Sequence, residues 1–270
     1  MVRLMTKKTP PTRHTGSTWQ RDNDSDTVIV FVHGFLSNAQ DCWRHSGTGK
    51  SWPDLVCNDE IFSNADVFLG AYYTRIDSKQ LTLNDNTEEL FRSLKNTLHD
   101  SSSSLLKRKN IIFLCHSYGG IVVRNLLVKK SKYFKEKNVG LLLFASPSKG
   151  SDWANRLSPL ARLYGNKVAA TLRSGSGMLT SLNTDFVNLI NSGEIKIVGK
   201  EFSEHHFIFN YTFVPFSFTR VVDADSSGNF FPNPFLIPDT DHFDIVKPSA
   251  EDYVQHTELR NFYLEDFIGK

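Results

Sequence analysis

Runs of apolar residues alternate along this chain with amphipathic stretches. The runs at residues 28–32, 66–71, 110–115 and 139–145 are almost entirely apolar, which predicts strands buried on both faces. Between them, residues 86–98 carry apolar side chains three or four positions apart, which predicts a helix with one buried stripe. Further helices are predicted near residues 51–56 and over residues 120–133. Strands that alternate with helices pair in parallel through right-handed crossovers. The pattern therefore predicts an α/β fold with a mostly parallel central sheet flanked by helices.

The second half of the chain adds a different pattern. Residues 151–192 carry apolar side chains at helical spacing, and we expect them to form an inserted cap over the strand ends. Residues 202–218 are crowded with aromatic side chains, at a spacing more typical of packed strands than of a lipid-binding surface. A cap lined by phenylalanine would favour an apolar acyl or aryl group. We expect a partly ordered tail over residues 1–26 and a single domain over residues 27–270.

Composition narrows the class of protein. A chain of 270 residues with 40% hydrophobic residues is long enough to bury one large core. A net charge of +2 without a long basic stripe argues against a nucleic-acid partner. Three cysteines make no even disulfide framework, which favours a reducing compartment and a cytoplasmic location. The polar N-terminus predicts neither a signal peptide nor an integral membrane segment; peripheral membrane contact is compatible with the sequence, and the oligomeric state is left open.

Ser117 is the candidate nucleophile. It stands between the apolar run that ends at Cys115 and an apolar helical pattern, so the sequence predicts a sharp strand-to-helix turn that exposes the hydroxyl. Gly119 and Gly120 keep this turn small and let the helix pack closely. Cys115 replaces the glycine of the Gly-x-Ser-x-Gly pattern. A serine at this place is also a common helix N-cap, so the window alone leaves catalysis and capping open.

A second segment supplies candidate donors for an oxyanion. His33, Gly34 and Phe35 follow the first buried strand. In serine hydrolases of the α/β type, such a turn directs one backbone N–H at the developing negative charge, and the residue after the nucleophile supplies another. The predicted donors are therefore the N–H groups of Phe35 and Tyr118, and His33 is expected to brace the loop.

His242 is the candidate base, because a loop histidine near the C-terminus fits the chain order Ser, acid, His. Among the nine histidines, His33 belongs to the oxyanion turn and His99 lies in a polar, helix-like stretch. His205 and His206 are adjacent, so their side chains point in different directions and make a poor metal site. We expect no metal and no organic cofactor.

Several further segments match in order a known group of enzymes. They are the His33 to Phe35 turn, Trp43, residues 51–55, residues 66–72, residues 116–120, residues 146–151 and residues 241–243. With these residues the chain resembles the α/β-hydrolases of the serine esterase and lipase group, and is similar to the glycosylphosphatidylinositol inositol-deacylase and serine active site-containing protein types. The resemblance implies an ester-cleaving enzyme with a Ser, acid, His triad.

The acid of this triad has several candidates. Glu201 directly follows the strand predicted over residues 195–200, and it resembles the glutamate that ends this strand in the similar family. Asp225 ends the next strand-like run and lies closer in sequence to His242. Asp223 is a third candidate. Chain order favours Glu201, and any of the three is also compatible with a solvated loop carboxylate.

The expected activity is acyl transfer from a small-molecule or lipid ester to water. An acyltransferase or thioesterase with the same triad, and a non-catalytic binding protein that kept the fold, remain open alternatives. A dinucleotide-binding fold would share the strand and helix alternation. It is disfavoured because no strand is followed by Gly-x-Gly-x-x-Gly and no glycine-rich loop carries Lys-Ser or Lys-Thr.

Overall fold

The computed structural model describes residues 16–35, 37–74, 82–96, 104–146, 176–205 and 230–269. These residues build a seven-stranded sheet in the order β1-β3-β2-β4-β5-β6-β7. Strand β1 runs antiparallel to β3, and the other neighbours are parallel. The strands are β1 Thr18–Arg21, β2 Thr27–Val32, β3 Ala65–Gly70, β4 Asn110–His116, β5 Asn138–Phe144, β6 Lys196–Glu204 and β7 Phe235–Ile237.

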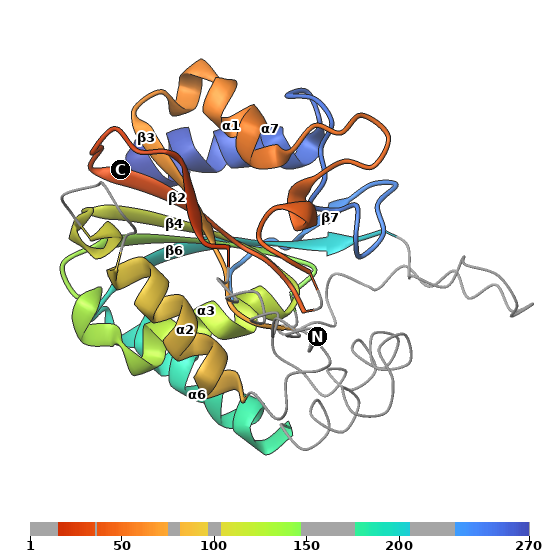
Figure 1. The fold of residues 1–270 in the computed structure, drawn as a ribbon. Helices are drawn as coiled ribbons and strands as arrows, with labels where there is room; N and C mark the ends of the chain where they lie inside the picture. Colours follow the sequence, from red (N-terminus) through yellow and green to blue (C-terminus); the bar gives the residue numbers. More distant parts are fainter. Residues whose placement is uncertain are drawn as a thin grey trace, which may run out of the picture.

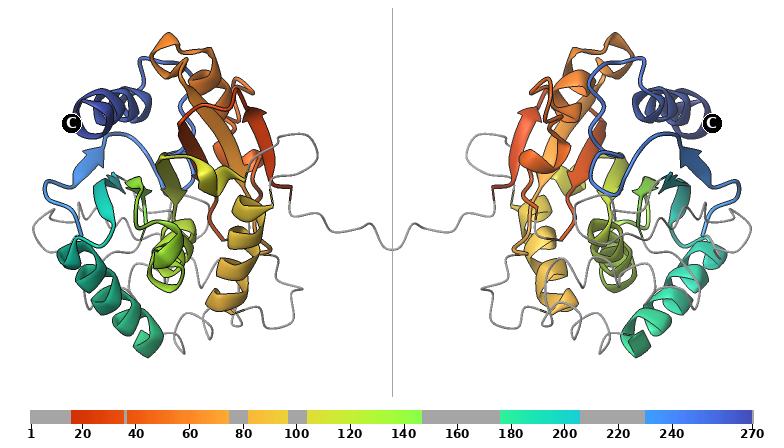
Figure 2. Two further views of the ribbon diagram at one scale, coloured as in Figure 1. Left: turned by 90° about the vertical axis from the view of Figure 1, so that its left-hand side faces the viewer. Right: turned by 90° about the vertical axis from the view of Figure 1, so that its right-hand side faces the viewer.

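Helices cover both faces of this sheet (Figures 1 and 2). On one face lie α1, Trp52–Asn58, and α7, Val254–Asn261, which a π-helical segment, η5, Phe262–Ile268, continues. On the other face lie α2, Leu83–Lys95, α3, Tyr118–Lys129, and α6, Ser176–Ser192. Short 3₁₀ turns add η1 Asp41–Trp43, η2 Glu60–Phe62, η3 Leu105–Lys107 and η4 Ser131–Tyr133.

Strand β2 shows how the apolar runs form two cores. Its residues are all buried, and alternate side chains point to opposite faces. Val28 and Val30 join the core under α2, α3 and α6, whereas Ile29 and Phe31 join the core under α1 and α7. Burial on both sides of β2 confirms the prediction of strands buried on both faces. Each fully buried side chain of this size contributes about 1.5–3 kcal/mol to the stability of the fold.

Helix starts follow local capping chemistry. Thr82 and Asp85 form a capping box, in which each side chain accepts a hydrogen bond from the other residue's backbone N–H. The helix predicted over residues 86–98 therefore begins earlier, at Leu83. Ser51 caps α1 by accepting from the N–H of Asp54. The helix predicted over residues 120–133 begins at Tyr118, directly after the turn, and ends at Lys129.

Two elements lie where the sequence predicts something else. β1 lies within the predicted tail, residues 1–26, and is the antiparallel edge strand. α6 lies within the predicted cap, residues 151–192, but it packs beside α3 and buries Leu182 and Phe186 in the core of the sheet. This part of the predicted cap is therefore the helix that connects β5 to β6. The other cap residues and the aromatic segment after His205 lie outside the described residues.

Candidate active site

Ser117 lies in the turn between β4 and α3, at the carboxyl ends of the parallel strands. Its backbone has φ +50° and ψ −122°, a region that L-residues rarely adopt and that costs about 1–3 kcal/mol. The N–H of Ser117 donates to the carbonyl of Phe144 at 2.9 Å, so the neighbouring strand β5 holds the turn. This is the sharp strand-to-helix turn that the sequence predicts, but Ser117 is buried in the structure instead of exposed.

The two glycines after Ser117 have no room for a side chain. A Cβ on Gly119 would lie 2.5 Å from the carbonyl oxygens of Val32 and His33. A Cβ on Gly120 would lie 2.2 Å from Oγ of Ser146, beyond the end of β5. Real Cβ atoms do not approach other atoms so closely, so glycine is required for α3 to start against the ends of β2 and β5.

The turn after β2 packs directly on Ser117. A Cβ on Gly34 would lie 3.1 Å from Cβ of Ser117. The Gly34 carbonyl accepts a hydrogen bond from Nδ1 of His33 at 2.8 Å and one from Oγ of Ser37 at 2.9 Å. The following peptide is trans, so the N–H of Phe35 points away from these two donors. His33 thus braces the turn and fixes the orientation of the Phe35 N–H.

Phe35 and Tyr118, the two predicted oxyanion residues, lie on the segments that flank Ser117. Their rings meet edge to face, with centroids 5.6 Å apart. Tyr118 is the first residue of α3, so its N–H has no acceptor within the helix. The hydroxyl of Tyr118 accepts from Nδ2 of Asn86 in α2 at 3.3 Å, which fixes the side chain.

His242 lies in the loop after β7 and faces Ser117. Its Nε2 is 2.9 Å from Oγ of Ser117, and its side chain is buried. The carboxylate of Asp241 accepts hydrogen bonds from the N–H groups of Phe243 and Asp244, which forms a tight turn around the histidine. Residues 125 positions apart in the chain are thus brought together in the geometry of a hydroxyl and its base.

The carboxylate that meets His242 belongs to Glu204. Its Oε1 lies 3.3 Å from Nδ1 of His242. An ionised carboxylate only accepts hydrogen bonds, so the tautomer with the proton on Nδ1 suits both contacts and directs the lone pair of Nε2 at Ser117. Glu204 is the last residue of β6, where it pairs in register with Ile237 of β7.

Glu201, the acid favoured by chain order, is placed differently. Its Oε1 accepts hydrogen bonds from the N–H groups of Phe230 and Phe231, and its charge acts on the buried Arg124. Strand β6 extends to Glu204 instead of ending at Lys200. Since side chains alternate along a strand, Glu201 and Glu204 point to opposite faces. Asp225 and Asp223 lie outside the described residues.

Three other side chains near Ser117 titrate far from their usual range. Burial lowers the pKa of His33 to about 4. Burial, followed by the nearby His242, lowers the pKa of His116 well below its usual value. Burial also raises the pKa of Tyr118 to about 12. At neutral pH all three side chains are therefore uncharged.

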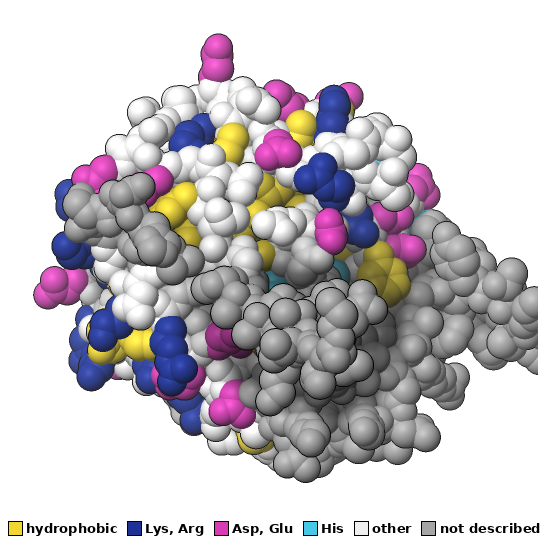
Figure 3. All heavy atoms as spheres, viewed as in Figure 1, with side chains coloured by type: hydrophobic (Ala, Val, Ile, Leu, Met, Phe, Trp, Pro, Cys, Tyr) yellow, Lys and Arg dark blue, Asp and Glu magenta, His cyan; other side chains and the backbone are white. Residues whose placement is uncertain are grey.

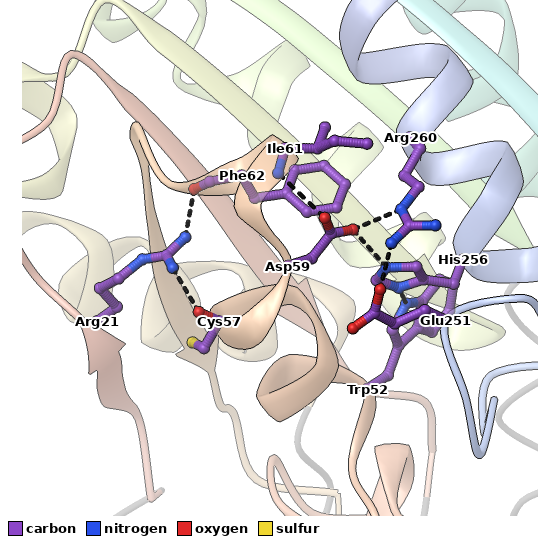
Figure 4. A network of polar contacts seen from close by, with 9 residues as sticks. All are labelled: Arg21, Trp52, Cys57, Asp59, Ile61, Phe62, Glu251, His256 and Arg260. Carbon is purple, nitrogen blue, oxygen red and sulfur yellow. Dashed lines mark hydrogen bonds and ion pairs between the residues drawn. The ribbon is translucent and has the colours of Figure 1, made fainter.

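A second histidine and carboxylate pair lies between α1 and α7 (Figure 4). Nε2 of His256 is 2.8 Å from Oδ2 of Asp59, and the indole N–H of Trp52 donates to Nδ1 of His256 at 3.1 Å. Nε of Arg260 lies 2.5 Å from the same Asp59 oxygen. Both ring nitrogens of His256 are occupied by these partners, so this pair joins two helices.

The described residues contain no group of three or more His, Cys, Asp or Glu side chains suited to a metal ion. In the same part of the chain, no helix is both long and apolar enough to cross a bilayer.

On the face seen in Figure 3, Lys and Arg side chains are interspersed with Asp and Glu, and histidine appears near the centre beside apolar side chains.

Comparison of the sequence with known proteins finds distant relatives only. No protein-family model matches the chain. Protein SERAC1 from Danio rerio is 23% identical over 262 residues, which cover 93% of this chain and 37% of that protein, so the chain spans just over a third of the relative's length.

Two solved structures match over most of the chain. MGS-MChE2, an alpha/beta hydrolase enzyme from the metagenome of lagoon sediments at Mar Chica, Morocco, superposes with a TM-score of 0.51 at 12% identity, over 94% of this chain and 97% of that one. Esterase B from Lactobacillus rhamnosis, solved with a tributyrin phosphonate, superposes with a TM-score of 0.50 at 13% identity, over 93% and 77% of the two chains. The seven-stranded sheet and these neighbours confirm the prediction: this chain has the α/β-hydrolase fold.

Proposed function

We propose that this protein is a serine hydrolase that cleaves a carboxylic ester, with Ser117 as nucleophile, His242 as base and Glu204 as the acid. The observation that carries the proposal is the contact of 2.9 Å between Nε2 of His242 and Oγ of Ser117, with Glu204 at the opposite ring nitrogen. A hydroxyl needs such a base because its own pKa leaves it a weak nucleophile.

The first half of the reaction forms an acyl-enzyme. Oγ of Ser117 bonds to the ester carbonyl carbon while Nε2 of His242 takes the hydroxyl proton. The carbonyl electron pair moves to oxygen, where the N–H groups of Phe35 and Tyr118 donate to the oxyanion. The carbonyl re-forms as the alcohol leaves, and the imidazolium gives that alcohol its proton. Glu204 stabilises the imidazolium by accepting from Nδ1.

The second half repeats these steps with water. His242 takes a proton from water as the water oxygen bonds to the acyl carbon, and the same two N–H groups stabilise the second oxyanion. Oγ of Ser117 then leaves with the proton from His242, and the carboxylic acid is released. No step requires a metal or an organic cofactor.

An apolar acyl group is the proposed substrate class. Esterase B, a neighbour in fold, was solved with a tributyrin phosphonate, and residues 202–218 of this chain are rich in phenylalanine. All three cysteines are free thiols, which supports a reducing, cytoplasmic location. Peripheral contact with a membrane that supplies the ester is compatible with this proposal.

A fluorophosphonate probe tests the proposal, together with nitrophenyl esters of increasing acyl length. We expect covalent labelling of Ser117, located by peptide mass spectrometry, and turnover that Ser117→Ala abolishes. Full-length protein that is folded but neither labelled nor active would contradict the proposal. Preferred transfer to an added alcohol or thiol would instead assign an acyltransferase with the same triad.

A further inference from the structure

His116, the residue before Ser117, makes a contact that the reaction scheme above does not use. Its ring is buried, and its Nε2 lies 2.7 Å from the backbone carbonyl oxygen of His242. A carbonyl oxygen only accepts hydrogen bonds, so Nε2 of His116 must carry the proton. In the neutral ring Nδ1 is then an acceptor, and the thiol of Cys42 lies 3.5 Å from it.

These contacts join three remote segments. Cys42 lies in η1, shortly after the oxyanion turn, His116 ends β4, and His242 lies in the loop after β7. All three side chains are buried. A Cβ on Gly34 would lie only 2.9 Å from Nδ1 of His116, so the turn after β2 closes the remaining side of the ring. The imidazole of His116 is therefore confined as well as hydrogen-bonded.

We propose that His116 is a positioning residue, which holds the backbone of His242 so that its imidazole stays within reach of Ser117 and Glu204. The inference rests on the proposed function, because it assigns a task to His116 only if His242 is the base. The side chain of His242 is held by two contacts, of 2.9 Å to Ser117 and 3.3 Å to Glu204. His116 adds a third contact, at the backbone of the same residue.

The rest of the loop does not replace this contact. Asp241 shapes the turn that follows the histidine, and the N–H of His205 donates to the carbonyl of Thr240 before it. Both contacts act on neighbours of His242. A shift of about 1 Å in a reacting group can cost about 100-fold in rate. Loss of the one backbone contact described at His242 can therefore lower the rate measurably.

Charge also suits His116 to this task. Its ring centroid lies 5.1 Å from that of His242, so a charged His116 would oppose the imidazolium that forms during catalysis. The burial of His116 keeps it neutral. A lysine or arginine at this place could donate to the same carbonyl but would bring that opposing charge.

Three full-chain variants test the inference. His116→Leu removes the donor, whereas His116→Gln keeps an N–H at a similar reach. His256→Gln changes another buried histidine far along the chain from Ser117 and serves as the matched control. We expect His116→Leu to lower kcat on a nitrophenyl ester by about 100-fold, with KM changed less than about threefold. His116→Gln should recover at least a tenth of the wild-type kcat, and His256→Gln should keep it.

A measurement on the wild-type protein tests the inference even if a variant fails to fold. Proton–nitrogen NMR correlation of the histidine rings should show His116 protonated at Nε2 and unprotonated at Nδ1. In His116→Leu, the proton resonance of His242 Nδ1 should move or broaden, which a general loss of stability far from the site would not produce.

Separate results overturn the inference and the proposed function. If Ser117→Ala is inactive but His116→Leu keeps the wild-type kcat and the His242 resonance, only the positioning role fails. A wild-type spectrum with the proton on Nδ1 of His116 also overturns that role alone. If Ser117→Ala keeps its activity, the proposed function fails, and the assignment of His116 fails with it.

Discussion

Two histidines in this protein each lie between a carboxylate and a second polar side chain, yet the two sites suit different tasks. His242 lies between Glu204 and the hydroxyl of Ser117. His256 lies between Asp59 and the indole N–H of Trp52. A hydroxyl can give its proton to a neutral imidazole, whereas an indole N–H only donates a hydrogen bond. The pair of polar groups at the histidine therefore does not itself define a catalytic site.

The surroundings of the two carboxylates differ as well. Asp59 also binds Arg260, whose guanidinium lowers the pKa of that carboxyl although burial alone would raise it. The positive charge of Arg260 opposes a second positive charge on His256, and burial lowers the pKa of that ring. His256 is thus held neutral. The comparison teaches that the neighbour of the histidine and the location at the strand ends distinguish His242, the proposed base, from His256.

Removal of the Ser117 hydroxyl should have the largest effect. Ser117→Ala leaves His242 without a nucleophile, so kcat should fall by about 10⁴-fold or more. Steady-state turnover of a nitrophenyl ester and probe labelling measure this loss. The melting temperature should stay nearly unchanged, because the substitution removes only one hydroxyl group. An active Ser117→Ala protein would mean that the two histidine sites do not differ in the way proposed.

Removal of the negative charge from the carboxylate at His242 should have the next largest effect. Glu204→Gln leaves Nδ1 of His242 without its anionic partner, and kcat should fall by about 10³- to 10⁴-fold. The same ester assay measures this change. Glu201→Gln is the matched control in the same strand.

The control, Glu201→Gln, should change the stability of the protein but not its turnover. Glu201→Gln removes a charge beside buried Arg124, so it should lower the free energy of unfolding by about 3 kcal/mol and leave kcat within about threefold. Urea unfolding measures the first quantity. A Glu201→Gln variant that is stable but inactive, with Glu204→Gln fully active, would return the acid role to Glu201.

Acid should unfold the protein through the histidines that are held neutral. The pKa of His33 is lowered to about 4, and those of His116 and His256 are also lowered. The unfolded state, with histidines near pKa 6.5, binds more protons below that pH, so the free energy of unfolding should fall as pH decreases from about 6.5 towards 4. His33 alone accounts for about 3 kcal/mol of this fall.

Urea unfolding at a series of pH values measures the acid effect. His33→Gln, which has no titrating ring, should flatten the slope between pH 6.5 and pH 4. An unchanged slope in this variant would show that His33 is not held neutral.

The smallest effect is expected at the second histidine site. His256→Gln breaks the bridge between Trp52 and Asp59, and it should lower the free energy of unfolding by about 1–3 kcal/mol without a change in kcat. Thermal unfolding and the ester assay measure the two quantities. A loss of turnover at unchanged stability would connect this site to catalysis and remove the contrast with His242.

Local patterns were sufficient for the parts of the site formed by neighbouring residues. The apolar runs predict β2 and β4 within one residue of the observed ends, because a strand buried on both faces must be apolar throughout. Ser117 with Gly119 and Gly120 predicts the sharp turn, since only small residues fit between the ends of β2 and β5. The prediction of His242 rested on chain order instead, and the structure places its Nε2 2.9 Å from Oγ of Ser117.

The proposed acid, Glu204, was not predicted from such patterns. Lys200 and Glu201 interrupt the apolar run of β6, so the sequence indicates a strand end there. Pairing with β7 extends the strand to Glu204, and that pairing joins residues more than thirty positions apart in the chain.

The amino-acid sequence by itself determined the layered α/β architecture and the turn at Ser117, because both depend on apolar runs and small residues that lie close together in the chain. Chain order also predicted the histidine that faces Ser117. The tertiary structure alone decided that Glu204 reaches His242, that His116 contacts the backbone carbonyl of His242, and that His256 binds Asp59 instead. These choices depend on which side chains meet across segments far apart in sequence. Hydrogen bonding acts over about 3 Å, a scale that only the packed fold defines.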